Sequence, residues 1–289
     1  MNTTDSYSSP KWGKGIRIYV ALLLILSLSL ASCAYTVPYV GTNPENSQFE
    51  HGTPVPPLDF LGDVLSKLPQ LLLWNRRYGN HQISAETEKT LAEFLKAYDL
   101  SKVKVRINQW APHKEIGRLV KNPHIAWPYK IVFFPSTLVT SLIGRPLSCL
   151  LVSDYFDPAS NSIHIFSDDP AIALHEAGHA LDFARQEFKG TYALARIAPG
   201  VNLFQEGMAT DEAMHYLEET GQYEELIKAY KSLYPAYATY VVGYVSSSPP
   251  AYVGAILIGH WIGRVAARDK RWQLETEGKW PSKNLGLAI

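Results

Sequence analysis

The segment His175-Glu176-Ala177-Gly178-His179 constrains this chain more than any other. In a helix, residues four apart lie one turn apart on the same face, so the imidazoles of His175 and His179 can bind one ion. Glu176 lies beside them and can take a proton from a bound water without being a ligand. Residues 172–181 hold no other charged residue. The segment therefore predicts a metal site on a helix that is buried under a sheet.

The residues on either side predict the elements around this site. Strand-forming residues occupy 162–166, after a turn at 157–161. Asp169 is a suitable N-cap and Pro170 suits the first helical position, so a helix is expected from there to about Phe188, with Gly190 as its stop. A second helix is expected from about Asn202 to about Gly221.

With these elements the motif resembles that of the zincin metallopeptidases, from Asp157 to roughly Tyr216. In the gluzincin branch a glutamate on a later helix is the third ligand, often within Glu-Gly-x-Ala, and this chain has Glu206-Gly207-Met208-Ala209. The resemblance implies a zincin-like α+β fold, in which a small sheet lies over the HExxH helix and a second helix bears the third ligand. It also implies that residues 161–166 form the edge of the sheet, to which the peptide substrate binds in an extended conformation.

The resemblance implies one Zn²⁺ ion bound by His175, His179 and Glu206, but it leaves the third ligand open. Gluzincins often place an aspartate four residues after that ligand to orient a histidine, and Thr210 occupies this position here. Asp182, one turn beyond His179, could orient a histidine instead or could itself be the third ligand. Some other residue is a further alternative.

The implied activity is zinc-dependent endopeptidase hydrolysis of a peptide or protein substrate. Zinc would activate a water molecule and Glu176 would act as the general base. Tyr192, Tyr216 and His215 are candidates for the group that stabilises the oxyanion, and the sequence does not choose among them. Two alternatives share the metal: an envelope lipoprotein whose zinc is structural, and an amidase acting on wall peptides.

The N-terminus predicts a membrane attachment. Basic residues precede an uncharged, largely apolar stretch at 18–30, about as long as the core of a signal peptide. The tetrapeptide Leu30-Ala31-Ser32-Cys33 resembles the lipobox of bacterial lipoproteins, which implies a signal peptide over 1–32 and acylation of Cys33, for example with palmitate. Ala34 favours the outer membrane facing the periplasm. The alternative is an uncleaved anchor helix with an incidental cysteine.

The rest of the chain divides by composition. Residues 33–57 are expected to form a tether and 58–232 the metallopeptidase domain, followed by an apolar Gly/Ala-rich helical hairpin over 233–267 and a polar tail over 268–289. Small residues recur every four positions from Ala251 to Ala267, which favours close approach of another helix. The hairpin could pack on the domain or on itself, lie in a membrane interface, or form an oligomer contact.

The amino-acid composition argues against nucleic acid as a binding partner. Lysine plus arginine and aspartate plus glutamate both number 27, and no basic run indicates a nucleic-acid binder. The expected partners are a peptide or protein substrate, a membrane, and a second copy in a homo-oligomer. Of the remaining candidates, His164 is expected to point to solvent or to the cleft, His260 to be a satisfied buried histidine, and Cys149 to be a buried free thiol.

Four further local structures are predicted. Ser84 is expected to cap a helix that runs to about Tyr98. Residues 103–107 alternate apolar and basic, as in a half-buried strand. Pro69 is expected to break or kink a helix near 58–72, and residues 127–152 to be irregular with some strand.

Overall fold

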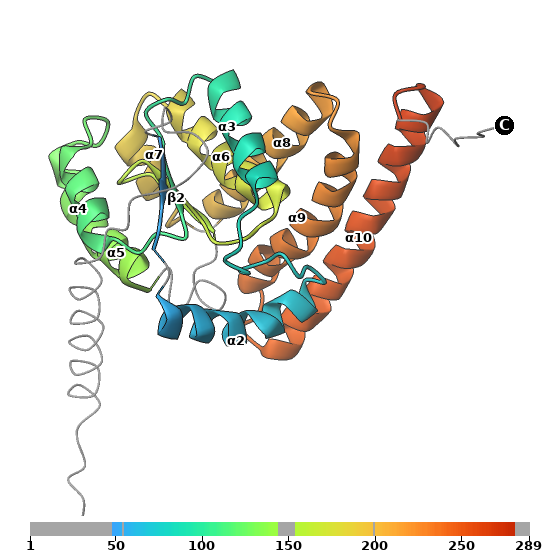
Figure 1. Ribbon diagram of the computed structural model, residues 1–289, viewed down its shortest axis with the longest axis horizontal. Helices are drawn as coiled ribbons and strands as arrows, with labels where there is room; N and C mark the ends of the chain where they lie inside the picture. The colour runs from blue at the N-terminus through green and yellow to red at the C-terminus, as the bar shows by residue number, and fades with distance from the viewer. Residues whose placement is uncertain (1–47, 54, 144–153, 199, 281–289) are drawn as a thin grey trace, which may run out of the picture.

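The computed structural model describes residues 48–53, 55–143, 154–198 and 200–280, and in this part of the chain it is a mixed α/β structure (Figure 1). The described strands form one four-stranded sheet in the order β1 (Phe49–His51), β2 (Lys104–Ile107), β4 (Ser162–Ile165), β3 (Tyr155–Asp157). β1, β2 and β4 are parallel, and β3 is antiparallel to β4. This arrangement is compatible with the predicted α+β class.

Helices precede, separate and follow the strands. Their bounds are α2 (Pro56–Leu72), α3 (Ala85–Ala97), α4 (Pro112–Lys121), α5 (Trp127–Ile143), α6 (Pro170–Arg185), α7 (Lys189–Ala195), α8 (Val201–Glu219), α9 (Tyr223–Gly243) and α10 (Pro249–Thr276).

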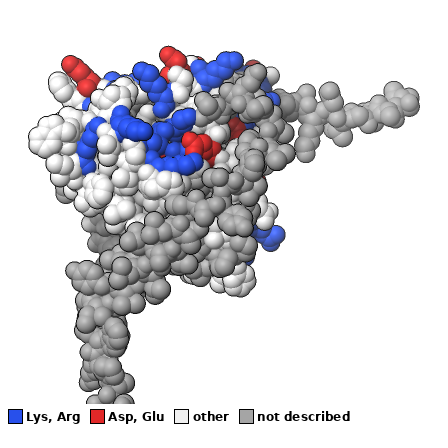
Figure 2. Space-filling view, turned by 60° about the vertical axis from the view of Figure 1, so that its left-hand side comes forward, with Lys and Arg blue, Asp and Glu red and all other residues white. Residues whose placement is uncertain are grey.

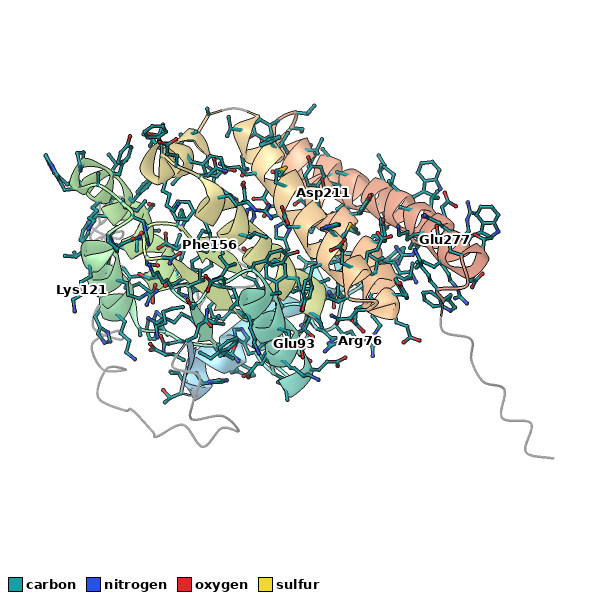
Figure 3. All side chains as sticks on the ribbon, turned by 90° about the horizontal axis from the view of Figure 1, so that it is seen from above. Arg76, Glu93, Lys121, Phe156, Asp211 and Glu277 are labelled. Carbon is teal, nitrogen blue, oxygen red and sulfur yellow. The ribbon has the colours of Figure 1, made fainter. Side chains whose placement is uncertain are left out.

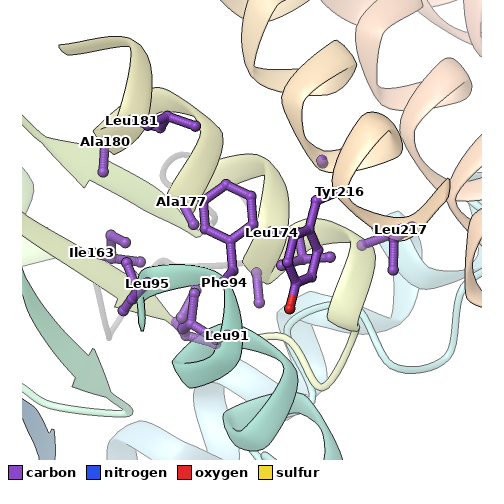
Figure 4. Packing of buried hydrophobic residues seen from close by; sticks show 14 of the residues in the cluster. Leu91, Phe94, Leu95, Ile163, Leu174, Ala177, Ala180, Leu181, Tyr216 and Leu217 are labelled. Carbon is purple, nitrogen blue, oxygen red and sulfur yellow. The ribbon is translucent and has the colours of Figure 1, made fainter. Parts of the chain in front are cut away.

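The main core lies between the sheet and the helices α3, α6 and α8. Leu91 and Phe94 of α3 are fully buried against α6 and α8, and they meet Leu174 and Tyr216 in the packing that Figure 4 shows. Ser84 caps α3 as predicted, because its hydroxyl accepts from the backbone N–H of Thr87 at 3.4 Å. Each fully buried side chain of this size contributes roughly 1.5–3 kcal/mol to the free energy of folding.

Both faces of the sheet are covered, which corrects two predictions. Val105 and Ile163 face the main core, whereas Arg106 and His164, next to them in sequence, face α4 on the other side. The strand at 103–107 is therefore not half-buried, and Arg106 is only 2% exposed. His164 does not point to solvent or to the cleft: it is 4% exposed, because α4 covers it and supplies Glu115 as its partner.

A third correction concerns β4. Residues 161–166 were expected to form a sheet edge, but β4, which spans Ser162–Ile165, pairs with β2 on one side and with β3 on the other. Its backbone groups are used within the sheet, so β4 has no free edge for a peptide. β1 and β3 are the edge strands among the described residues.

Two proline-containing segments are more helical than expected. Of residues 127–152, which were expected to be irregular, 127–143 form α5 and 144–152 lie outside the described residues. Phe133, Thr137 and Ser141 are its buried side chains, and because two of them are polar the helical periodicity was hidden. Pro135 leaves one backbone carbonyl of α5 without its usual donor. α2 likewise continues through Pro69 to Leu72, so the helix is not broken at this proline.

The last two helices pack side by side, as Figures 1 and 3 show. A Cβ atom on Gly259 would lie 2.7 Å from the Cα of Pro235, and one on Gly263 would lie 2.4 Å from the carbonyl oxygen of Tyr230. Both contacts are too close for any side chain, so the small residues of α10 are needed for its approach to α9. The prediction that this stripe receives another helix is confirmed, and the helix is α9.

The N-terminal predictions fall mostly outside the described residues, as do Cys33 and Cys149. Within the segment expected to be a tether, residues 49–51 form β1, which pairs with β2 at the edge of the sheet. None of the described helices combines the length and the apolar character needed to cross a bilayer.

Candidate metal centre

α6 places His175, Glu176 and His179 at the bottom of a buried site. The helix begins as predicted, because the Asp169 side chain accepts from the backbone N–H of Ala171 at 2.9 Å and Pro170 occupies the first turn. It ends at Arg185, a few residues before the predicted end, and α7 begins at Lys189. Residues 173–183 are buried throughout.

α8 brings Glu206 to the same point because α6 and α8 approach closely at Gly178. A Cβ atom on Gly178 would lie 2.5 Å from the carbonyl oxygen of Ala209, so a larger residue would push the two helices apart. Glu206 lies in the second turn of α8, and its side chain is fully buried. The glycine between the two histidines is therefore required by the geometry of the site.

The three predicted ligands converge on one point. Nε2 of His175 lies 3.1 Å from Oε2 of Glu206, and Nε2 of His179 lies 3.4 Å from the same oxygen. One ligand atom from each of the three residues lies within 4.8 Å of the other two, so the group could hold a metal ion. No other such group occurs in the part of the chain that the structure describes.

The electrostatics of the three groups favour a cation between them. Burial opposes charge on Glu206, but hydrogen bonds from His175 and His179 hold its pKa well below the ordinary value. Burial lowers the pKa of His179 to about 4, so this imidazole is neutral, as a metal ligand must be. Burial also disfavours the charged form of His175, yet Glu206 and Glu176 raise its pKa. Glu206 is thus ionised beside a neutral His179, which are the charge states that ligands of a cation have.

Two residues hold the ligands in place, and the sequence pointed to only one of them. The Thr210 hydroxyl lies 3.2 Å from Nδ1 of His175, so the residue in the position of the expected aspartate contacts that histidine. Arg196, just beyond α7, donates to Oε1 of Glu206 and leaves Oε2 for the histidines. No local pattern marks Arg196, because its contact depends on how the α7–α8 turn folds back.

Asp182 lies elsewhere in the same helix. Its carboxylate accepts from the Tyr192 hydroxyl and from Nε2 of Gln186 at 3.0 Å, and it is not among the three grouped ligand residues. Asp182 therefore links α6 to α7, and Thr210 is the residue placed to orient His175.

Glu176 is placed to act as a proton acceptor. It is 7% exposed. Burial, together with the negative charges of Glu206 and Asp154, outweighs the influence of His175 and raises its pKa to about 7. Asp154 is held beside the site because it accepts from the backbone N–H groups of Phe166 and Ser167, at 2.7 and 2.9 Å.

A cavity of about 340 Å³ adjoins the metal centre. His175, Glu176 and Thr210 line it, together with residues of α2, α9 and α10 and with Tyr78, Asp154 and Ile172. Tyr240 of α9 lines it too. Burial of the Tyr240 hydroxyl and the nearby carboxylates of Glu206 and Glu176 raise its pKa well above the ordinary value, so the phenol keeps its proton. A protonated donor thus borders the cavity together with the three buried site residues.

No protein-family model, curated protein or solved structure matches this chain. The interpretation of the site therefore depends on its own geometry.

The three residues expected to compete for the oxyanion role are used otherwise. Tyr216 packs in the core against Phe94, with ring centroids 5.0 Å apart. His215 is exposed and lies 3.7 Å from Glu219. Tyr192 donates to Asp182. Tyr240 was missed because it lies in α9, far from the motif in sequence, and its only signal was its place in an uncharged tyrosine-rich stretch.

The structure also shows the surroundings of two other histidines for which the sequence made predictions. His260 is buried, with its Nε2 2.9 Å from the carbonyl oxygen of Leu72, so it is a satisfied buried histidine as predicted. His164 belongs to the opposite face of the sheet, as described above.

A second hollow, of about 690 Å³, lies over α4 and the adjacent strand ends. Figure 2 shows Lys and Arg side chains gathered on this side of the molecule. Lys102, Lys104, Lys114, Arg118 and Lys121 line the hollow. Arg118 is engaged internally, because it donates to Ser162 Oγ and to the carbonyl oxygens of Ser160 and Asn161. The basic character comes from folding, since the sequence has no basic run here.

Proposed function

We propose that this chain is a zinc-dependent endopeptidase of the zincin type, similar to gluzincins, with His175, His179 and Glu206 as zinc ligands and Glu176 as general base. The observation that carries the proposal is the convergence of both Nε2 atoms on Oε2 of Glu206, beside a buried carboxyl and a cavity. Two imidazoles and one carboxylate form a donor set found in catalytic zinc sites, where a fourth position stays open.

The distances between the ligand atoms suit zinc. Zinc binds nitrogen and oxygen ligands at about 2.0–2.2 Å, so the ligand atoms of a tetrahedral site lie about 3.3–3.5 Å apart. The observed separations from Oε2 of Glu206, 3.1 and 3.4 Å, agree to within a few tenths of an ångström. Arg196 fixes the other carboxylate oxygen, so Glu206 offers one oxygen to the ion.

The chain's own groups would then divide the work of hydrolysis. Zinc, when bound, acidifies a water molecule and polarises the scissile carbonyl. Glu176 accepts the proton of the attacking water and passes it to the leaving amine, a role that its pKa of about 7 suits. Tyr240, which keeps its proton, donates a hydrogen bond to the oxyanion. Thr210 orients His175 throughout.

The proposed location comes from the sequence alone. Cys33 would be acylated after removal of residues 1–32, which would anchor the chain as a lipoprotein in a bacterial cell envelope, on the periplasmic side of the outer membrane. Several acyl chains on one cysteine give stable attachment. The substrate would be a peptide or protein at that surface.

The test uses the full chain, its metal content and the hydrolysis of an unfolded, fluorescently labelled protein. We expect one zinc per chain. Glu206→Ala should lose the zinc, whereas Asp211→Asn, an exposed position on the same helix, should keep it. Glu176→Gln should keep the zinc and lower the hydrolysis rate by about 10²–10⁴-fold.

Two results would reject the proposal. If Glu176→Gln cleaves as fast as the unchanged chain, Glu176 is not the general base. If the chain holds zinc and never cleaves, the zinc is structural, as in the alternative interpretation of the sequence.

A further inference from the structure

α2 exposes a row of large apolar side chains on its outer side. They recur at helical spacing from Phe60 to Leu71, and Leu71 is 69% exposed. The row consists of Phe60, Val64, Leu68 and Leu71. Soluble proteins expose single apolar residues often, but a continuous row of this kind marks an interaction surface.

The first half of α10 exposes a second row. Leu257, Ile258 and Trp261 are 52%, 58% and 69% exposed. In the preceding turn Val245 is exposed as well. Residues 233–263 contain no Asp, Glu, Lys or Arg, so this part of the surface has none of the charges that keep a water-facing helix hydrated. We call the two rows, Phe60–Leu71 on α2 and Leu257–Trp261 on α10, the docking face.

The two helices that bear these rows are in contact. His260 lies 2.9 Å from the carbonyl oxygen of Leu72, so the end of α2 rests on α10. The rings of Trp74 and His260 stack 4.0 Å apart, and the Arg264 guanidinium lies 4.4 Å from the centre of the Trp74 ring. In Figure 1, α2 and the end of α10 that begins at Pro249 lie at the same lower side of the molecule.

The cavity beside the metal centre reaches this surface. Leu68 lines the cavity and is at the same time 59% exposed. Tyr240 also lines the cavity and is partly exposed. The apolar side chains of Leu72 and Ile256 line it as well. The mouth of the cavity is therefore bordered by a residue of the docking face.

The chain outside the described residues points to what covers the face. Cys33 precedes Gln48, the first described residue, by 15 residues, and a segment of that length reaches at most about 50 Å. A chain anchored in lipid at or before Cys33 therefore holds its folded part within that distance of a bilayer. The docking face is largely apolar, with Lys67 exposed among its α2 residues, and a helical face of this kind binds lipid while a lysine on it reaches the polar surface.

We propose that the docking face lies in the interfacial layer of a lipid bilayer, with α2 parallel to the membrane surface and the cavity mouth at Leu68 opening toward lipid. Amphipathic helices bind in this way without crossing the membrane, which suits α2 at 17 residues. The proposal rests on the proposed lipid anchor at Cys33, concerns binding alone, and stands whether or not the metal centre hydrolyses peptides.

The test is photo-crosslinking of the full chain in vesicles of phosphatidylethanolamine and phosphatidylglycerol. The photoreactive residue p-benzoylphenylalanine is placed at Leu71, at Ile258 or at Leu68, one position per variant. The matched control is Val120 on α4, which is exposed to a similar degree (62%) but lies outside the docking face. Adducts are identified by mass spectrometry as lipid or as protein.

We expect lipid adducts at the three face positions in about tenfold higher yield than at Val120, because only the face enters the acyl region. Equal yields at all four positions would show that the face is in water and would overturn the proposal. Predominant protein–protein adducts at Leu71 and Ile258 would overturn it as well, since a second copy or another protein would then cover the face.

Discussion

The protein buries ionisable groups on both sides of its sheet, and the two groups behave in opposite ways. On one side Glu176 belongs to the metal centre and is 7% exposed; on the other side Glu115 is 2% exposed. Burial alone raises the pKa of both carboxyls. For Glu176 it prevails and gives a pKa of about 7. For Glu115 the effect of burial is outweighed by a hydrogen bond from His164 and by the charges of His164 and Arg106. The pKa of Glu115 therefore falls well below the ordinary value.

The difference lies in the partners. Glu115 accepts from Nε of Arg106 at 2.8 Å and lies 3.5 Å from Nε2 of His164, while Arg106 also pairs with Glu50. We call these four residues the ion-pair cluster. For Glu176 the charges of His175 and Arg196 do not offset its burial, and it faces a cavity and lies near two other carboxylates. Equal burial therefore does not identify a functional site; an uncompensated group beside a cavity does.

The largest expected effect is on the ion-pair cluster. Glu115→Gln leaves Arg106 buried with half of its compensation, so the free energy of unfolding should fall by about 3–5 kcal/mol in chemical denaturation at pH 7. Glu93→Gln, which removes one partner of the exposed Lys89 pair, should change it by less than about 0.5 kcal/mol.

The pH dependence of this effect has a definite sign. The pKa of Glu115 is lowered in the folded state, so its stabilisation is full above the unfolded value of 4.5 and is lost as the pH falls below it. The gap between the unchanged chain and Glu115→Gln should narrow in acid. If the Glu115→Gln protein is as stable as the Glu93→Gln control, the ion-pair cluster does not stabilise the fold and the contrast between Glu115 and Glu176 fails.

The second prediction concerns Glu176, whose substitution should stabilise the folded protein rather than destabilise it. In protein stripped of metal by a chelator, Glu176→Gln should raise the free energy of unfolding by about 3 kcal/mol at pH 8, because a buried carboxylate is removed. The folded pKa is about 7 and the ordinary value 4.5, so the unchanged chain loses stability as the pH rises between them. The increase in the free energy of unfolding caused by Glu176→Gln should therefore be near zero at pH 4.

Denaturation at pH 4 and at pH 8 checks this prediction. The same stability difference at both values would mean that Glu176 titrates normally, and the contrast with Glu115 would then lose its electrostatic basis.

The smallest effect tests the support of the metal ligands. Thr210→Val keeps the shape of the side chain but removes the hydroxyl that lies 3.2 Å from Nδ1 of His175. Zinc affinity should fall by about 10–100-fold in competition with a chromophoric chelator. Thr140→Val on α5, whose hydroxyl donates only to its own helix, is the control. Equal affinities in both variants would mean that Thr210 does not orient His175.

Local sequence determined the elements that carry the site. Asp169, Pro170 and Ser84 start their helices as predicted, because capping depends on neighbouring residues only. The four-residue spacing placed His175 and His179 on one face for the same reason. Glu206 was reached by a resemblance rather than by spacing, and the close approach at Gly178 explains how it meets the histidines.

Tertiary structure alone decided the rest. The burial of His164 depends on α4, the contact of Arg196 with Glu206 on the turn before α8, and the position of Tyr240 on the return of α9 over the metal centre. The basic hollow likewise gathers lysines from separate segments. Contacts between residues far apart in sequence leave no local periodicity or cap, because they are set by which faces the helices bury. For that reason the sequence could supply the ligands of the metal centre but not the cavity, the donor and the supporting groups around it.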